Sequence, residues 1–417
     1  MLGSRFVQVV LAAAVALIVL GGWRATTVAS TQKSSAARAT WLPGASDTDE
    51  GRIRQRATAA VLGALVADAA SMGLHWIYDT DKIQDLLSHH GRRDEPAFFE
   101  PPSCPYYDYD SGFFSPYGDE LLPVLQYMAD QDRGTLDGPG FAEYLAAYYR
   151  NYTGRLNKSS RAMMEAVLQG GRKWPECGDP RDTQANNFVK VIPIVARYAG
   201  RPGLAQAVDA AVRAQQNNDE AVELAWAAAL VLEQVVLGHS IAAALEWLAG
   251  GAPGSRRPVS KSVLQALASV LEHRRSNTAL RDLLYAPGSA SKAGEWGASC
   301  ANPGALKGAL LGAVQASGQP ARGSRAKAAG TSSSSGGGGK ADSGAFARGV
   351  RSNMLLGGDN CSRSVLLGAL LAAEGGLGSI PSAWRAKTRG LAHAEVLTEQ
   401  LLDSRGGGVG AAGAAAE

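Results

Sequence analysis

The feature that most constrains this chain is a glycine pair, followed by polar residues and a long apolar run, between Asn353 and Ala373. The pair leads into four side chains that bear different functional groups: Asp359, Asn360, Cys361 and Ser362. Glycine lets a backbone approach a neighbour or ligand closely, whereas Asp, Asn and Ser cap helices by accepting hydrogen bonds from free N–H groups. The run Val365–Ala373 is too apolar for a surface helix. We therefore expect a buried helix to begin beside Gly357 and Gly358.

Three interpretations of this stretch stay open. Helix N-termini attract anions and clustered oxygens attract hard cations, which favours a binding site. An ordinary capped helix after a glycine turn explains the same spacing without a ligand. A thiol at a helix N-terminus can be reactive, and Arg363 adjoins Cys361, although a buried inert thiol is the commoner case.

The composition favours helix and excludes several classes of function. The 417 residues are 46% hydrophobic and 19% charged, and β-branched residues seldom cluster, so we expect an all-α fold. A net charge of +3 is too small to indicate a nucleic-acid partner. The four cysteines are far apart without CxxC spacing, so neither a zinc site nor a disulfide framework is indicated.

The first fifty residues form a separate leader. Arg5 precedes an apolar run of eighteen residues, Phe6–Trp23, and no acidic residue occurs before Asp47. Val28-Ala29-Ser30 is an acceptable cleavage site. We expect a signal sequence, a membrane anchor or a plastid-type transit peptide, so membrane contact would occur only through this segment. The alternative is a buried helix of the main domain.

Helical patterns continue from Arg52 onward. We expect helices over Ala57–Gly73, Leu121–Ala129, Gly140–Asn151, Lys158–Gly170, Asn186–Tyr198, Asp219–Leu237, Val263–Arg275 and Asn302–Val314. Pro193 predicts that its helix is kinked or started at proline. The expected domain spans residues 51–404, with a low-complexity insertion over about 315–343 and a flexible tail over 405–417.

Three features in the first half of the chain carry alternatives. Asp68 lies alone in an apolar helix, so its carboxylate must be paired or hydrogen-bonded; it is either a ligand-binding group or a structural bond to a neighbouring helix end. His75 alone is more typical of a packing residue than of a ligand. The aromatic segment Asp94–Glu120 is either a lid that stacks on a flat ligand or a loop folded on its own rings.

Five segments resemble, in order, the motifs of one family. They are GALVADAASMG (Gly63–Gly73), YGDELLPVL (Tyr117–Leu125), NNFVKVIPI (Asn186–Ile194), RAQQNNDEAVELA (Arg213–Ala225), and CANPGALKGAL followed by GGDNCSRS, with a tail at Gly378, Ile380, Pro381 and Trp384. Together they resemble the ADP-ribosylglycohydrolase family, in particular the branch that contains jellyfish J-type crystallins and selenoprotein J. The resemblance implies an orthogonal helical bundle.

The resemblance also implies one or two Mg²⁺ ions, held by a Thr-Asp-Asp motif and by Gly-Asp-x-Asp-Thr. Tyr117 and Gly118 stand at the Thr and the first Asp, while Asp119 keeps the second. Near the C-terminus Asp359 keeps the first Asp, Cys361 replaces the second and Ser362 replaces the Thr, and Asn217 stands where histidine is usual. The implied metal ligands are therefore Asp119, Asp359 and Ser362, because a thiol binds Mg²⁺ poorly.

Two functions follow as expectations. The first is hydrolysis of the glycosidic link of ADP-ribose on a protein or small molecule, with Asp119 or Glu120 orienting the attacking water. The residues expected to bind substrate are Asp68, Gly118, Asn186, Asn187, Phe188, Gly357, Gly358, Asn360 and Cys361. The second is a non-catalytic, crystallin-like structural or ADP-ribose-binding protein, which the motif losses favour. The oligomeric state stays open.

Overall fold

The computed structural model describes residues 49–130, 136–285, 293–318 and 344–406. The predicted leader, most of the predicted insertion and most of the predicted tail lie outside these residues. Within them the fold is all-α, as the composition predicted, and the one β-bridge joins Ile77 to Gly358.

Between residues 49 and 249, the described residues form ten α-helices and one short 3₁₀ helix. They are α2 (Glu50–Ser71), η1 (Met72–Leu74), α3 (Thr80–His89), α4 (Pro116–Ala129), α5 (Gly138–Asn151), α6 (Lys158–Leu168), α7 (Asn186–Val189), α8 (Val191–Tyr198), α9 (Leu204–Arg213), α10 (Asp219–Val236) and α11 (Ile241–Ala249).

The second half continues the same pattern. Its elements are α12 (Lys261–Arg275), α13 (Leu280–Tyr285), η3 (Ala293–Trp296), α14 (Gly304–Gly318), α15 (Ala345–Met354), α16 (Asn360–Gly375), η6 (Leu377–Ser379), α17 (Ser382–Lys387), α18 (Leu391–Asp403) and η7 (Ser404–Gly406). No helix was predicted from the sequence at α3, α9, α11, α13, α15, α17 or α18.

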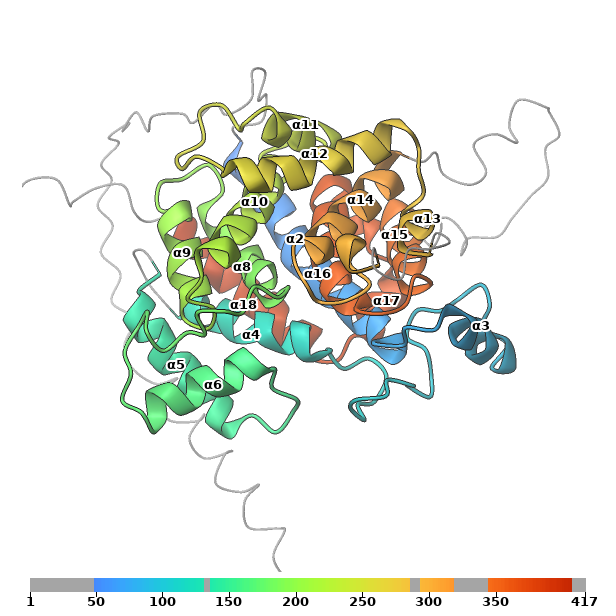
Figure 1. Ribbon diagram of the computed structural model, residues 1–417, viewed down its shortest axis with the longest axis horizontal. Coiled ribbons are helices and arrows are strands. Elements are labelled where there is room, and N and C mark those ends of the chain that lie inside the picture. The colour runs from blue at the N-terminus through green and yellow to red at the C-terminus, as the bar shows by residue number, and fades with distance from the viewer. Residues whose placement is uncertain (1–48, 131–135, 286–292, 319–343, 407–417) are drawn as a thin grey trace, which may run out of the picture. The chain divides into compact units, whose positions relative to one another are not determined.

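Helices α2 and α16 lie side by side and share the most extensive contact of any two elements (Figure 1). A Cβ on Gly63 would lie 2.3 Å from the Cβ of Ala372, and a Cβ on Gly368 would lie 2.6 Å from the Gly63 carbonyl oxygen. Glycine at these two positions therefore lets the backbones touch. This contact explains why α2 is built from small residues and why nearly all of it is buried.

The remaining helices cover this central pair on different sides. Helices α14 and α15 pack on α16, whereas α8, α18 and α4 pack on α2; α10 in turn contacts α8, α9 and α11. The helix over residues 50–74 is long and apolar enough to cross a membrane, but 94% of its most apolar 18-residue stretch is buried inside the protein. A buried core helix explains this composition.

Several predicted boundaries were wrong for local reasons. Helix α4 begins at Pro116 rather than Leu121, because the Ser115 hydroxyl accepts from the Tyr117 N–H and proline suits the first helical position. The segment Asn186–Tyr198 is two helices that meet at Lys190, with Pro193 in the first turn of the second.

The described residues at the start of the predicted insertion and of the predicted tail are helical. Residues 315–318 complete α14 instead of opening a linker. Arg405 is not part of a tail, because its buried guanidinium donates to the carbonyl oxygens of Ala196, Arg197 and Ala199 and pairs with Glu50. The C-terminal end of α18 is thereby tied to the start of α2.

The α2–α16 contact predicts that Gly368→Ala destabilises the protein. Alanine is the better helix former by about 1 kcal/mol, yet its methyl group would lie 2.4 Å from the Ala67 Cβ, and such overpacking typically costs about 1–3 kcal/mol. Urea denaturation should show a lower free energy of unfolding. Gly318→Ala is the control, because nothing lies within 4 Å of a Cβ at the end of α14; equal effects would contradict the close approach.

Candidate functional site

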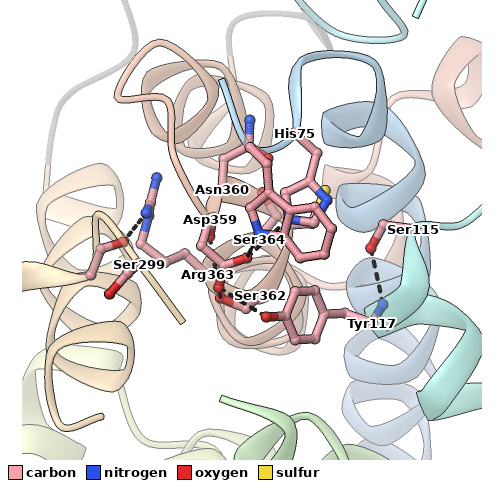
Figure 2. Close-up of polar contacts among 12 residues, drawn as sticks. His75, Ser115, Tyr117, Ser299, Asp359, Asn360, Ser362, Arg363 and Ser364 are labelled. Carbon is pink, nitrogen blue, oxygen red and sulfur yellow. Dashed lines mark hydrogen bonds and ion pairs between the residues drawn. The ribbon is translucent and has the colours of Figure 1, made fainter. Parts of the chain in front are cut away.

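The Asp359 carboxylate, which precedes α16, is the centre of a buried hydrogen-bond cluster (Figure 2). It does not cap its own helix. Its Oδ1 accepts from His75 Nε2 at 2.9 Å and from the Trp76 indole N–H at 2.8 Å. Its Oδ2 accepts from the Tyr117 hydroxyl at 3.1 Å and from the Ser362 hydroxyl at 2.5 Å. Two donors thus occupy each oxygen.

The titration behaviour of Asp359 and His75 follows from this cluster. Burial raises the pKa of Asp359, but the hydrogen bonds from His75 and Ser362 and the positive charge of Arg363 outweigh burial and hold that pKa below its ordinary value. Burial lowers the pKa of His75 despite the attraction of Asp359. A neutral His75 that donates from Nε2 to Asp359 and accepts at Nδ1 from the Tyr107 hydroxyl, 2.7 Å away, fits both directions.

The predicted glycine turn presents Asp359 to this cluster. Gly357 and Gly358 have φ values of +63° and +60°, which suit glycine. A Cβ on Gly358 would lie 2.1 Å from the Ala298 carbonyl oxygen. The buried Arg363 guanidinium donates to the Gly297 and Gly357 carbonyl oxygens, so it ties the two loops that flank Asp359.

Trp76 reaches Asp359 from a strained backbone. Its φ is +58°, a left-handed conformation that is uncommon for a bulky residue and that costs of order 1–3 kcal/mol. Its N–H donates to the Gly358 carbonyl oxygen at 2.8 Å, and the Gly358 N–H donates to the Ile77 carbonyl oxygen at 2.7 Å. The turn of Gly358 thus clamps the segment that carries His75 and Trp76.

A cavity of about 320 Å³ lies next to this cluster. Its lining residues are Trp76, Tyr78, Tyr106, Pro116, Tyr117, Arg155, Asn157, Lys158, Gln184, Asn186 and Cys300. Two of them, Trp76 and Tyr117, also donate to Asp359. The buried carboxylate therefore reaches the cavity through two aromatic side chains.

The cavity is aromatic and cationic. The Tyr106 ring meets the Trp76 ring edge-on at 5.4 Å between centroids, and the Arg155 guanidinium lies 5.0 Å from the Trp76 ring centroid. Tyr78 and Tyr106 are 47% and 55% exposed, which leaves ring surface open to a ligand. Arg155 and Lys158 line the cavity, and no Asp or Glu does. Such a surface suits an anion that carries a flat ring.

The two predicted catalytic acids do not line this cavity. Asp119 accepts from the Tyr152 hydroxyl at 2.5 Å, and burial raises its pKa to about 6. Glu120 accepts from the amides of Asn157 and Asn186 and from the Ser160 hydroxyl. Burial also raises the Glu120 pKa. Glu120 thus contacts two residues that line the cavity, Asn157 and Asn186, but does not itself line it.

A buried lysine accompanies Glu120. Lys190 donates to the Asn186 carbonyl oxygen at 2.7 Å. Burial lowers the pKa of Lys190 to about 8, against the attraction of Glu120. Together these groups fix Asn186, the first residue of α7, against α4, so that Asn186 is held in the cavity wall.

Asp68 makes the structural bond that the sequence left as an alternative. Its carboxylate accepts from the Ser115 N–H at 2.7 Å and from the Ser115 hydroxyl at 2.5 Å, at the N-terminus of α4. A Cβ on Gly118 would lie 2.3 Å from Asp68 Oδ2, so glycine at 118 makes room for this carboxylate. Burial raises the pKa of Asp68 to about 7.

Cys361 is a buried free thiol in this structure. It is fully buried, its Sγ lies 3.9 Å from the Asp68 carbonyl oxygen, and burial raises its pKa well above the ordinary value. The thiolate hypothesis needs a lowered pKa at the helix N-terminus. The burial of Cys361 where α2 and α16 pack together argues against that hypothesis.

Of the residues predicted to bind substrate, Asn186 lines the cavity. Asn187 donates to the Ala221 carbonyl oxygen and Phe188 is in the core, while Asn360 donates to the Leu74 carbonyl oxygen. Gly357 and Gly358 allow a close backbone approach, and Gly118 makes room for the Asp68 carboxylate. Sequence reasoning missed seven lining residues: Trp76, Tyr78, Arg155, Asn157, Lys158, Gln184 and Cys300. Its aromatic lid contained Tyr106 and Tyr117, which do line the cavity.

The arrangement of these residues does not fit the magnesium that the resemblance implies. Both oxygens of Asp359 already accept two hydrogen bonds each. The hydroxyl of Ser362, another implied metal ligand, is one of these donors. Asp119 bonds Tyr152 and shares no donor with Asp359. Within the described part of the chain, no group of three His, Cys, Asp or Glu side chains could hold a metal ion. Magnesium stays a prediction for titration to test.

Comparison with known proteins gives a consistent result. A sequence model of the ADP-ribosylglycohydrolase family matches residues 49–409. Crystallin J1A of Tripedalia cystophora is 27% identical over 81% of this chain and 93% of its own length. Crystallin J1B of the same animal is 31% identical over 45% of this chain and 60% of its own length.

A solved structure shares the fold. It is described as an ADP-ribosylglycohydrolase-related protein complex, and it matches with a TM-score of 0.56 and 21% identity over 85% of this chain and 99% of that chain. These matches confirm the predicted family, its crystallin branch and the predicted helical fold.

The raised pKa of Asp68 predicts a pH-dependent stability. The folded-state pKa of about 7 lies above the ordinary value of 3.8, so the folded protein holds a proton that the unfolded chain releases. The resulting stabilisation is complete below about pH 4 and is lost as the pH rises to about 7; at 1.36 kcal/mol per pKa unit this is roughly 4 kcal/mol.

Asp68→Asn should remove this dependence, because the amide stays neutral. Chemical denaturation between pH 4 and 8 should show the wild-type advantage over the variant shrinking as the pH rises. Asp85→Asn, at an exposed site on α3, is the control. A constant difference between wild type and Asp68→Asn would contradict the raised pKa.

Proposed function

This chain belongs to the ADP-ribosylglycohydrolase family, and we propose that it binds ADP-ribose, or the ADP-ribosyl group of a modified molecule, without cleaving it. The ligand would occupy the 320 Å³ cavity beside Asp359. The observation that carries this proposal is the combination of four aromatic side chains and two cations in a lining that contains no acid.

The chemistry of ADP-ribose matches this lining. Its adenine is a flat ring that can stack on an exposed tyrosine such as Tyr78 or Tyr106. Its diphosphate carries the negative charge that Arg155 and Lys158 attract. The Arg155 guanidinium already lies over the Trp76 ring, and a guanidinium recognises phosphate oxygens in a bidentate geometry.

Absence of cleavage is proposed because the acids near the cavity serve other bonds. Hydrolysis needs a group that holds or activates water within hydrogen-bond reach of the scissile bond. Asp119 and Glu120 are turned to Tyr152, Asn157, Ser160 and Asn186. The curated relatives that match this chain are named crystallins, which supports a role other than turnover.

Hydrolysis of an ADP-ribosyl bond is the second candidate. It is favoured by the family match and by the Asp119 pKa of about 6, since a general acid or base works best with a pKa near the operating pH. This candidate requires Asp119 to leave Tyr152 and enter the cavity when a substrate binds.

Calorimetric titration of ADP-ribose into the full chain tests the binding proposal. We expect saturable binding that Arg155→Gln weakens about tenfold, because the substitution removes one charge-assisted contact, worth roughly 1.4 kcal/mol. Arg161→Gln is the matched control: Arg161 is an exposed cation one turn along α6 and does not line the cavity. Absence of binding, or equal losses in both variants, would overturn the proposal.

A turnover assay separates the two candidates. Peptides ADP-ribosylated on arginine or serine are incubated with the protein, and released ADP-ribose is quantified by chromatography. We expect no release above that of the buffer. Release that Asp119→Asn abolishes would establish the hydrolase instead.

A further inference from the structure

We infer that Asp359 is a positioning residue that holds Trp76 and Tyr117 as walls of the cavity, so that ligand binding there is independent of Mg²⁺. The ligand part of this inference rests on the proposed function. The metal part rests on the geometry of Asp359 alone.

Asp359 acts on the cavity only through other side chains. It is fully buried and does not line the cavity. Each of its oxygens bonds one cavity wall: Oδ1 accepts from Trp76 and Oδ2 accepts from Tyr117. Because the two rings are held by one carboxylate, their relative orientation is fixed before a ligand arrives, which reduces the ordering cost of binding.

The backbone of Trp76 indicates that this orientation is imposed. A tryptophan at φ +58° persists only where its surroundings determine it. Two bonds do so here, from its N–H to the Gly358 carbonyl oxygen and from its indole to Asp359. Both acceptors belong to the same turn, so that turn places the ring in the cavity wall.

His75 and Ser362 complete the set of four hydrogen-bond donors around the Asp359 carboxylate. His75 and Ser362 use the other lone pair of each oxygen. The buried Arg363 guanidinium acts electrostatically on Asp359 and supplies a positive charge. A Mg²⁺ ion requires oxygen ligands with free lone pairs in octahedral geometry, and would have to displace these donors while it added two positive charges.

The first test measures metal binding directly and needs no variant. Mn²⁺ is used as the probe because its free and bound forms differ by electron paramagnetic resonance. We expect no stoichiometric Mn²⁺ binding to the full chain at millimolar ion. Stoichiometric binding that Asp359→Asn abolishes would overturn the inference.

The second test measures ADP-ribose affinity in EDTA and in Mg²⁺. We expect dissociation constants that agree within about twofold in the two buffers, and a loss of about tenfold in Asp359→Asn, again in both buffers. Asp85→Asn, at an exposed position, is the control. Tenfold tighter binding in Mg²⁺ than in EDTA would overturn the inference.

A spectroscopic readout separates positioning from general stability. The chain has eight tryptophans, and Trp76→Phe identifies the Trp76 indole N–H signal in a ¹⁵N–¹H spectrum. We expect Asp359→Asn to shift this signal, since the hydrogen-bond acceptor has changed, while the other indole signals stay in place. An unchanged Trp76 signal would overturn the positioning role.

The outcomes keep the two proposals distinct. If ADP-ribose does not bind in either buffer, the proposed function fails, whereas the Mn²⁺ titration and the Trp76 signal still decide the inference. If ADP-ribose binds only with Mg²⁺, the proposed function stands and the inference fails.

Discussion

The structure depends on the contact between α2 and α16 at Gly63 and Gly368, where a side chain on either helix would collide with the other. The chain leaves α2 through η1 and reaches His75 and Trp76, and it enters α16 directly after Asp359. The two helices run antiparallel, since Gly63 lies against Ala372 and Ala67 lies against Gly368, so the end of α2 lies beside the start of α16. The hydrogen bonds that join His75 and Trp76 to Asp359 are a consequence of that packing.

What could be predicted from the sequence is what local chemistry determines. The glycine turn before Asp359, the buried helix after it and the small residues of α2 all follow from short patterns, and the motif order identified the family. The cavity wall could not be predicted in the same way, because Trp76, Arg155 and Cys300 come from three distant segments. Their meeting is decided by tertiary packing, as is the failure of Asp119 and Asp359 to share a partner.

Four acidic residues near the cavity join different segments of the chain through hydrogen bonds to their carboxylates. Asp359 joins residues 75–76 to α4 and α16, Asp68 joins α2 to α4, Glu120 joins α4 to α6 and α7, and Asp119 joins α4 to Tyr152. A buried carboxylate is costly unless each oxygen is bonded. Here the bonds come from hydroxyl, amide, indole and imidazole groups of the protein. These bonds hold the segments around a cavity that is lined by aromatic side chains and two cations and by no acid.

The close contact between position 118 and Asp68 limits which residues position 118 can hold. The resemblance places the first aspartate of the family motif at Gly118, but a Cβ there would lie 2.3 Å from Asp68 Oδ2. An aspartate at position 118 would have to displace the carboxylate that bonds the start of α4, and removing Asp68 would leave the Ser115 N–H without that acceptor. The side chains at positions 68 and 118 are therefore coupled, because a larger residue at 118 and the Ser115–Asp68 bonds compete for the same space.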